Sequence, residues 1–180
     1  MKITKSLALV GEVELDGVTA HIHATPISSA VFEQYFEPMS VAFANLHKRG
    51  LQGLGPKIAY LMLKKAAEQL GEWNQINSGL LTEVRRLTNI LLPDPSGWKQ
   101  IPYQSAIAQK LVSAEDQAEI DGAVVFFTLS FAVMGRKEVM AILPALTGWS
   151  LQLESLTLME YADLLPTLTE AGSSTSQANI

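Results

Sequence analysis

Residues 123–134 read AVVFFTLSFAVM, a segment without charged side chains that would be apolar on every side of a helix. Asp121 precedes it, and Arg136, Lys137 and Glu138 follow it. Its 12 residues are too few to cross a membrane, because a spanning helix needs roughly 20. A helix that is apolar all round is normally buried. We therefore expect this segment to form the central helix of a bundle.

The beginning and end of this helix are also indicated by the sequence. Ser113 is a favourable N-cap, because its side-chain oxygen can accept a hydrogen bond from the first turn. Glu115 and Asp116 follow in that turn, where negative charge suits the helix dipole. Gly135 is expected to end the helix. The pattern therefore predicts one long helix from Ser113 to Gly135.

The N-terminal residues 3–25 are predicted to form a β-hairpin. Apolar and polar residues alternate on both sides of Asp16-Gly17, a pair preferred in two-residue turns because both positions need positive φ. The register that follows pairs Leu15 with Val18, Glu14 with Thr19, Val13 with Ala20, and Glu12 with His21. One face of the hairpin is then apolar and the other polar, so we expect the apolar face to pack on the helices.

Apolar spacing indicates further helices between the hairpin and the central helix. Thr25-Pro26 is expected to open the first of them, and Pro38 to break it. A second helical piece is expected to end at Gly50, and the next helix at Gly71. Another is expected to run from about Asn77 or Ser78 to Pro93. Residues 93–102, PDPSGWKQIP, contain three prolines and one glycine and are interpreted as a long loop.

These patterns predict a mostly α protein, a helical bundle with a small N-terminal β-hairpin. A short helix is expected over residues 136–143, and a last one from Thr157, where Glu160 completes a capping box. The expected organisation is one domain over residues 1–170, with a hairpin over 3–25, helices over 26–92, a loop over 93–102, helices over 103–170, and a disordered tail over 171–180.

Composition excludes several classes of function. The chain of 180 residues contains no cysteine, which excludes disulfides, zinc–thiolate sites and thiol catalysis. Its formal net charge of −5 argues against nucleic acid as a partner, because such binding depends on lysine and arginine. Arg85 and Arg86 are adjacent, but with Glu83 nearby we expect them on a solvated helix face.

Two histidines are the first candidates for a metal site. His21 and His23 lie two residues apart on the predicted strand, so both would project from one face, near Glu12. Two histidines and a carboxylate can bind a metal, but an exposed polar strand face explains the same residues. We expect no metal, cofactor or catalytic residues here, and the glycine-rich loop at 50–55 lacks the preceding strand that a nucleotide site requires.

The three tryptophans, Trp73, Trp98 and Trp149, lie in or beside predicted loops. Tryptophan is common at the centres of protein interfaces, and it is also common as a loop anchor that packs back onto the core. Both interpretations stay open for each of them.

Residues 143–168, LPALTGWSLQLESLTLMEYADLLPTL, resemble the closing segment of bacteriophage tail assembly chaperones. In that family a phrase of the type Leu-x-Gly-aromatic-Ser precedes an amphipathic phrase that contains an acidic–aromatic pair. The matching residues here are Leu146, Gly148, Trp149 and Ser150, then Leu153, Leu156, Glu160, Tyr161 and Leu165. A hairpin followed by helices is also similar to the family.

The resemblance implies a non-enzymatic protein that binds the tape-measure protein, promotes assembly of the tail-tube protein around it, and self-associates. It further implies that the protein works in the bacterial host cytoplasm and does not stay in the mature virion. The net charge and the short apolar run lead us to expect neither a nucleic-acid nor a membrane partner. The expected partner-binding residues are Trp149, Leu153, Leu156, Tyr161 and Leu165. The alternatives are a structural tail or head-completion component of the particle and a small-molecule-binding helical protein.

Overall fold

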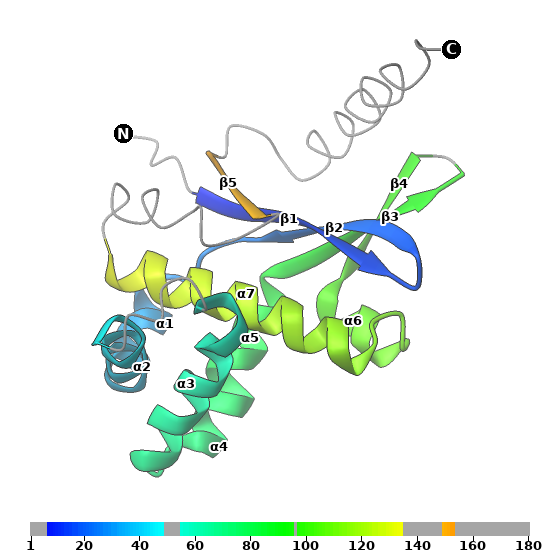
Figure 1. Ribbon diagram of the computed structural model, residues 1–180. Helices are drawn as coiled ribbons and strands as arrows, with labels where there is room; N and C mark the ends of the chain where they lie inside the picture. Colours follow the sequence, from blue (N-terminus) through cyan, green and yellow to red (C-terminus); the bar gives the residue numbers. More distant parts are fainter. Residues whose placement is uncertain (1–6, 49–54, 96, 135–148, 154–180) are drawn as a thin grey trace, which may run out of the picture.

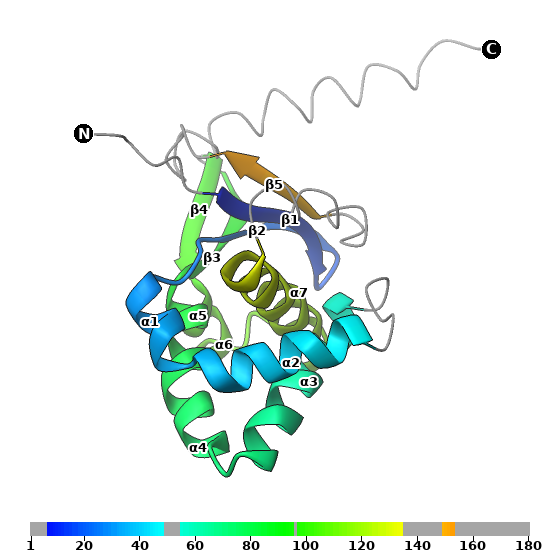
Figure 2. The same cartoon turned by 90° about the vertical axis from the view of Figure 1, so that its left-hand side faces the viewer.

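The computed structural model describes residues 7–48, 55–95, 97–134 and 149–153. In this part of the chain a five-stranded antiparallel sheet is covered on one side by helices (Figures 1 and 2). The expectation of a helical bundle with one small hairpin is therefore wrong, and the fold is a mixed α and β layer structure. No described helix is long and apolar enough to cross a membrane.

The sheet has the strand order β4-β3-β2-β1-β5, and all neighbouring strands are antiparallel. The strands are β1 (Leu7–Leu15), β2 (Val18–Ala24), β3 (Thr88–Asp94), β4 (Gly97–Pro102) and β5 (Trp149–Leu153). The helices are α1 (Ser29–Gln34), α2 (Phe36–Lys48), α3 (Gly55–Gln69), α4 (Trp73–Gln75), the π-helix η2 (Ile76–Leu80), α5 (Leu81–Arg86), α6 (Tyr103–Ala108) and α7 (Ala114–Val133).

The β1–β2 hairpin confirms the predicted turn and register. Asp16 and Gly17 both have positive φ, 50° and 78°, as a tight two-residue turn requires. The structure pairs Leu15 with Val18, Glu14 with Thr19, Val13 with Ala20 and Glu12 with His21. Ile22 and Val13 are buried on the face that contributes to the core. The alternation of the sequence therefore predicted the pairing and the face that packs on the core, and His21 and His23 on the other face are buried too.

The segment from residue 88 to residue 102 corrects two predictions. The helix predicted to stop at Pro93 ends at Arg86, and the supposed loop 93–102 is mostly the β3–β4 hairpin. The residues of β3 are apolar at helical spacing but also form a short run typical of a buried strand, and periodicity cannot separate the two. Pro93 is tolerated because β3 pairs with β2 only as far as Leu91, so its missing N–H lies beyond that ladder.

β5 corrects the prediction that residues 103–170 contain only helices. Trp149–Leu153 pairs with β1 at the edge of the sheet, with Trp149 opposite Gly11 and Leu153 opposite Leu7. The sequence WSLQL alternates apolar and polar residues, which is the strand signal that the helical interpretation overlooked. The helix expected over 136–143, the capping box at Thr157 and the tail over 171–180 lie outside the described residues.

The long apolar helix confirms its predicted place in the fold. α7 starts after Ser113, whose side chain accepts a hydrogen bond from Asp116 N–H while the Asp116 carboxylate accepts one from Ser113 N–H, a capping box. It lies directly beneath the sheet and contacts α2, α3 and α5 on its other sides (Figure 2). Residues 120–130 are all buried.

The remaining helix boundaries follow ordinary rules, with one correction. The first helix is capped by Ser28 instead of Thr25, and it ends before Phe36, where α2 begins two residues ahead of Pro38. A proline is acceptable there, because the first turn of a helix needs no N–H donors. α3 ends just before Gly71, whose φ of 74° is typical of a helix C-terminus.

Candidate functional site

The predicted partner-binding residues are only partly placed by the structure. Trp149 and Leu153 stand at the two ends of β5, which joins the C-terminal part of the chain to the sheet through β1. Leu156, Tyr161 and Leu165 lie outside the described residues. The structure therefore brings the first two onto one edge strand, and the role of all five in partner binding stays a prediction.

The two candidate metal-binding histidines lie in a different environment from the expected exposed polar face. His21 and His23 are each only 6% exposed. The ring of His21 packs edge-on against Trp98 of β4, with centroids 5.0 Å apart. The strand β4, which was predicted to be part of a loop, therefore covers the side chain of His21. Among the described residues, no group of three or more histidine, aspartate or glutamate side chains could hold a metal ion.

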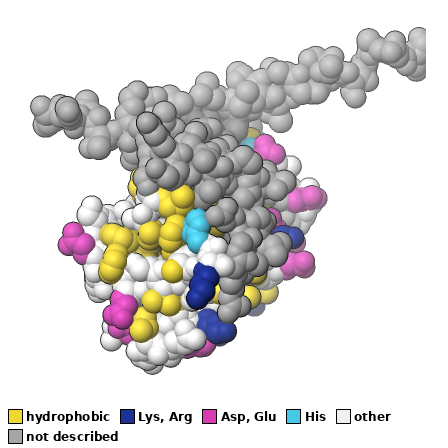
Figure 3. Space-filling view, turned by 60° about the vertical axis from the view of Figure 1, so that its left-hand side comes forward, with side chains coloured by type: hydrophobic (Ala, Val, Ile, Leu, Met, Phe, Trp, Pro, Cys, Tyr) yellow, Lys and Arg dark blue, Asp and Glu magenta, His cyan; other side chains and the backbone are white. Residues whose placement is uncertain are grey.

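A row of aromatic side chains lies on α1 and α2. We define the α2 stripe as Phe32, Phe36, Phe43 and His47. The rings of Phe32 and Phe36 meet edge to face at 5.6 Å, and those of Phe43 and His47 lie 4.2 Å apart. Phe36 is 55% exposed. Figure 3 shows hydrophobic side chains gathered on the side of the molecule where α1 and α2 lie.

The α2 stripe follows from helix geometry. Phe36, Phe43 and His47 are separated by seven and four residues, spacings that place side chains on one side of a helix. The adjoining side of α2 carries Met39 and Leu46, which are buried in the core. Phe32 and Phe43 are partly buried against the core, so the stripe is held in place by packing and does not have to be ordered when a partner binds.

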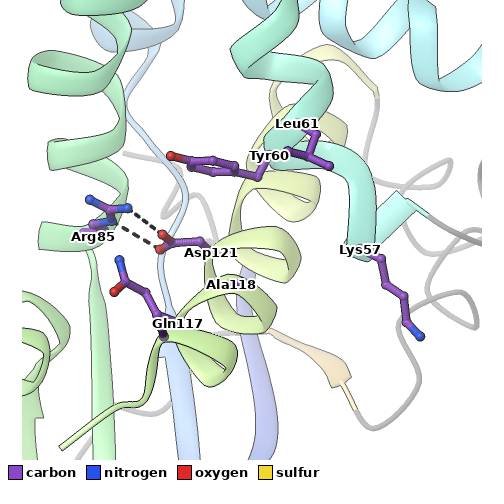
Figure 4. Close-up of a pocket in the computed structure, with 8 residues that line it drawn as sticks. Lys57, Tyr60, Leu61, Arg85, Gln117, Ala118 and Asp121 are labelled. Carbon is purple, nitrogen blue, oxygen red and sulfur yellow. Dashed lines mark hydrogen bonds and ion pairs between the residues drawn. The ribbon is translucent and has the colours of Figure 1, made fainter. Parts of the chain in front are cut away.

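The helices α3, α5 and α7 line an open pocket of about 420 Å³, shown in Figure 4. We define the α3–α7 pocket by its lining residues, which are Lys57, Tyr60, Leu61, Arg85, Ala114, Gln117, Ala118 and Asp121. Tyr60 and Gln117 lie around the Arg85–Asp121 pair at one end, whereas Lys57 extends away from the pair at the other (Figure 4). The pocket thus has a polar end, an apolar middle and a cation at the far end.

The polar end is organised by an ion pair between α5 and α7. Arg85 donates from Nε and Nη2 to the two carboxylate oxygens of Asp121, at 3.2 and 2.5 Å. The side chains are only 22% and 9% exposed. Burial alone would lower the pKa of Arg85, but the hydrogen bond and charge of Asp121 outweigh it, and the pKa is raised. Arg85 is thus a fixed cation, unlike the solvated residue that the sequence suggested.

The neighbouring arginine behaves as expected. Arg86 forms a similar two-point pair with Glu83 on the same helix, at 2.6 and 2.7 Å. Its side chain is 62% exposed. The two adjacent arginines therefore offer a direct comparison between a buried and an exposed ion pair of the same geometry.

A buried tyrosine forms a hydrogen bond with the backbone of a residue that lines the pocket. Tyr103 is 1% exposed, and its hydroxyl donates to the backbone carbonyl of Gln117 at 3.3 Å. Burial raises the pKa of Tyr103, and the charge of Asp121 raises it further, so the phenol stays protonated. Tyr103 therefore acts as a neutral hydrogen-bond donor that helps to fix the first turns of α7.

Sequence reasoning overlooked both the stripe and the pocket. The seven- and four-residue spacings of Phe36, Phe43 and His47 were readable, but they became meaningful only once the buried side of α2 was known. The link between Arg85 and Asp121 spans 36 positions and leaves no local signal. The tryptophans differ from one another: Trp73 packs on Tyr60 at 6.2 Å, Trp98 packs on His21, and Trp149 belongs to β5.

We predict that the Arg85–Asp121 pair contributes far more to stability than its exposed counterpart. Asp121→Asn leaves a partly buried guanidinium without its counter-ion and should lower the free energy of unfolding by about 3 kcal/mol. Glu83→Gln is the matched control and should cost less than about 1 kcal/mol. Urea denaturation at neutral pH measures both. Equal losses for the two variants would contradict the assignment.

His21 predicts a pH dependence of stability. Burial lowers the pKa of His21 below its ordinary value of 6.5, and nearby Glu12 only partly opposes this. As the pH falls below 6.5, His21 therefore takes up a proton in the unfolded state before it does so in the folded state. Proton uptake favours the unfolded state, so the free energy of unfolding decreases as the pH falls from 6.5 toward the folded-state pKa. His21→Gln should reduce the difference in unfolding free energy between about pH 7.5 and about pH 5.5. An unchanged difference would refute the prediction.

Comparison with known proteins identified no relative of this chain. No protein-family model matches the sequence, and no curated protein or solved structure matches it at a significant level. The likeness to tail assembly chaperones therefore rests on residues 143–168, and a function has to be argued from these residues, the α2 stripe and the α3–α7 pocket.

Proposed function

We propose that this protein is a non-enzymatic tail assembly chaperone that binds a tape-measure protein and promotes assembly of the tail-tube protein around it. The observation that carries the proposal is the α2 stripe, in which Phe36 is 55% exposed and the neighbouring rings are held by the core. The resemblance of residues 143–168 to the chaperone family supports it independently.

The stripe has the properties that binding of an amphipathic helix requires. A tape-measure chain is expected to be a long helix with an apolar side, which would aggregate if left uncovered. Such a helix is recognised when its apolar residues, three or four positions apart, meet a matching apolar surface. Rigid aromatic side chains give large contact area at small entropic cost. The stripe provides such a surface on one side of the molecule.

Reversible covering of a long chain favours many weak contacts over one tight site. Several copies bound along one partner gain affinity through avidity, because each later contact forms between components that are already linked. We therefore propose that the protein self-associates at least along its partner. Trp149, Leu153, Leu156, Tyr161 and Leu165 are proposed to contribute a second contact, to the partner or to a neighbouring copy. The proposed location is the bacterial host cytoplasm, and the mature virion is proposed not to contain the protein.

The proposal is tested by co-expressing the chain with the tape-measure protein encoded beside it. The native chain should keep that protein soluble and elute with it in size-exclusion chromatography. Phe36→Asp places a charge at the most exposed ring of the stripe and should weaken the complex by about tenfold or more, as loss of an aromatic interface residue commonly does.

Leu70→Asp is the control, because Leu70 is also an exposed apolar residue, at 37%, but lies near the end of α3 and not in the stripe. It should leave the complex unchanged, and both variants should melt like the native chain. A tape-measure protein that is equally soluble with and without this chain would overturn the proposal. Stoichiometric amounts of the chain in purified virions would instead favour a structural component of the particle.

A further inference from the structure

We propose that the α3–α7 pocket binds a carboxylate group attached to a short apolar chain. This inference concerns a surface other than the α2 stripe and does not depend on the chaperone proposal. It rests on the charges at the two ends of the pocket, on its apolar middle, and on its volume of about 420 Å³, which lies within the range of sites that bind small ligands or single side chains.

The charge of the pocket favours an anion. Two of its lining residues are cations, Lys57 and Arg85, and one is an anion, Asp121. Asp121 is already bound by Arg85 through both of its oxygens. The pocket therefore keeps one positive charge in excess, although the chain as a whole has a formal net charge of −5. This excess lies at an exposed end of the pocket, where it attracts an anion modestly.

Lys57 supplies that excess charge. Its side chain is exposed and forms no ion pair with another described residue. Lys64 lies on the same helix. It pairs with Glu68 at 3.9 Å and lies over the ring of Trp73. Lys57 is thus available to a ligand in a way that Lys64 is not.

Arg85 offers further donors at the opposite end. A guanidinium has five N–H donors in a planar arrangement, and Asp121 receives bonds from Nε and Nη2 only. The hydrogens of Nη1 are not used by Asp121. Because the pair is rigid and largely buried, a ligand that reaches it finds donors that are already oriented, which lowers the entropic cost of binding.

The middle of the pocket is apolar, and for this reason we propose a ligand whose carboxylate is attached to an apolar chain. Leu61 is 57% exposed, the largest value among the exposed large hydrophobic side chains of the described residues. It faces a pocket that also includes Ala114 and Ala118, which lie one turn apart on α7. A short apolar chain lying across these three residues would cover Leu61, and burial of apolar surface is favourable. A ligand of this kind could be a free fatty acid or the glutamate of a bound helix.

The proposal is tested with hexanoate and its neutral counterpart hexanamide, followed by amide resonances in NMR. Hexanoate should cause saturable shifts at Tyr60, Gln117 and Ala118. Hexanamide should bind at least about fivefold more weakly, as expected for loss of roughly one kcal/mol of charge interaction at a partly exposed site. Equal affinity for the two probes, or shifts that do not saturate, would overturn the proposal.

Variants outside the ion pair keep the test independent of folding. Lys57→Gln should weaken hexanoate binding about fivefold and leave hexanamide binding unchanged. Lys64→Gln, on the same helix but outside the pocket, is the control and should change neither. An unchanged affinity for hexanoate in Lys57→Gln would also overturn the proposal.

A helical peptide with one glutamate on its apolar side identifies the source of the carboxylate. If it binds more tightly than hexanoate and competes with it, the natural ligand is the acidic side chain of a helix. If it fails to bind while hexanoate binds, the ligand is a free carboxylic acid. Both outcomes support carboxylate binding by the pocket. Failure of both probes would reject the pocket as a binding site and leave the chaperone proposal untouched.

Discussion

Burial of the second half of α7 is the constraint on which the rest of the fold depends. Residues 120–130 are buried on every side, so the helix has to be surrounded. The sheet covers one side, and α2, α3 and α5 cover the others. Each large apolar side chain removed from water contributes about 1.5–3 kcal/mol, and the two hydroxyl groups in the segment need partners, as Thr128 shows by donating to the carbonyl of Val124 at 2.8 Å. The sheet and the three helices therefore have to keep their positions around α7.

Local signals in the sequence predicted the elements that depend on neighbouring residues. Asp16-Gly17 determined the β1–β2 turn, and Ser113 with Asp116 determined the start of α7. The rest of the sheet depends on distant partners: β3 reaches β2 from more than sixty residues away, and β5 reaches β1 from much farther. An apolar run such as Thr88–Asp94 can form a strand or a helix, and only the available edge of the hairpin selects between them. Apolar spacing favoured the helix for this run, and the prolines of residues 93–102 made a loop the simpler prediction for β4.

The candidate sites were predictable to a smaller extent. The resemblance directed attention to residues 143–168, of which the structure describes only Trp149–Leu153. The α2 stripe and the α3–α7 pocket depend on which side of each helix is buried and on which helices meet. Arg85 illustrates the difficulty, since its sequence neighbour Arg86 has the same composition around it and is solvated, whereas Arg85 meets Asp121 because α5 and α7 cross at that point.

The central claim is that the α2 stripe is the surface that receives a helical partner, and hydrogen exchange of the complex tests it most directly. The chain would be compared alone and bound to the tape-measure protein by mass spectrometry. Peptides from α1 and α2, around Phe36 and Phe43, should exchange more slowly in the complex, whereas peptides from β4 should not change. If a complex forms and the α1–α2 peptides exchange at the same rate as in the free chain, the stripe is not the binding surface.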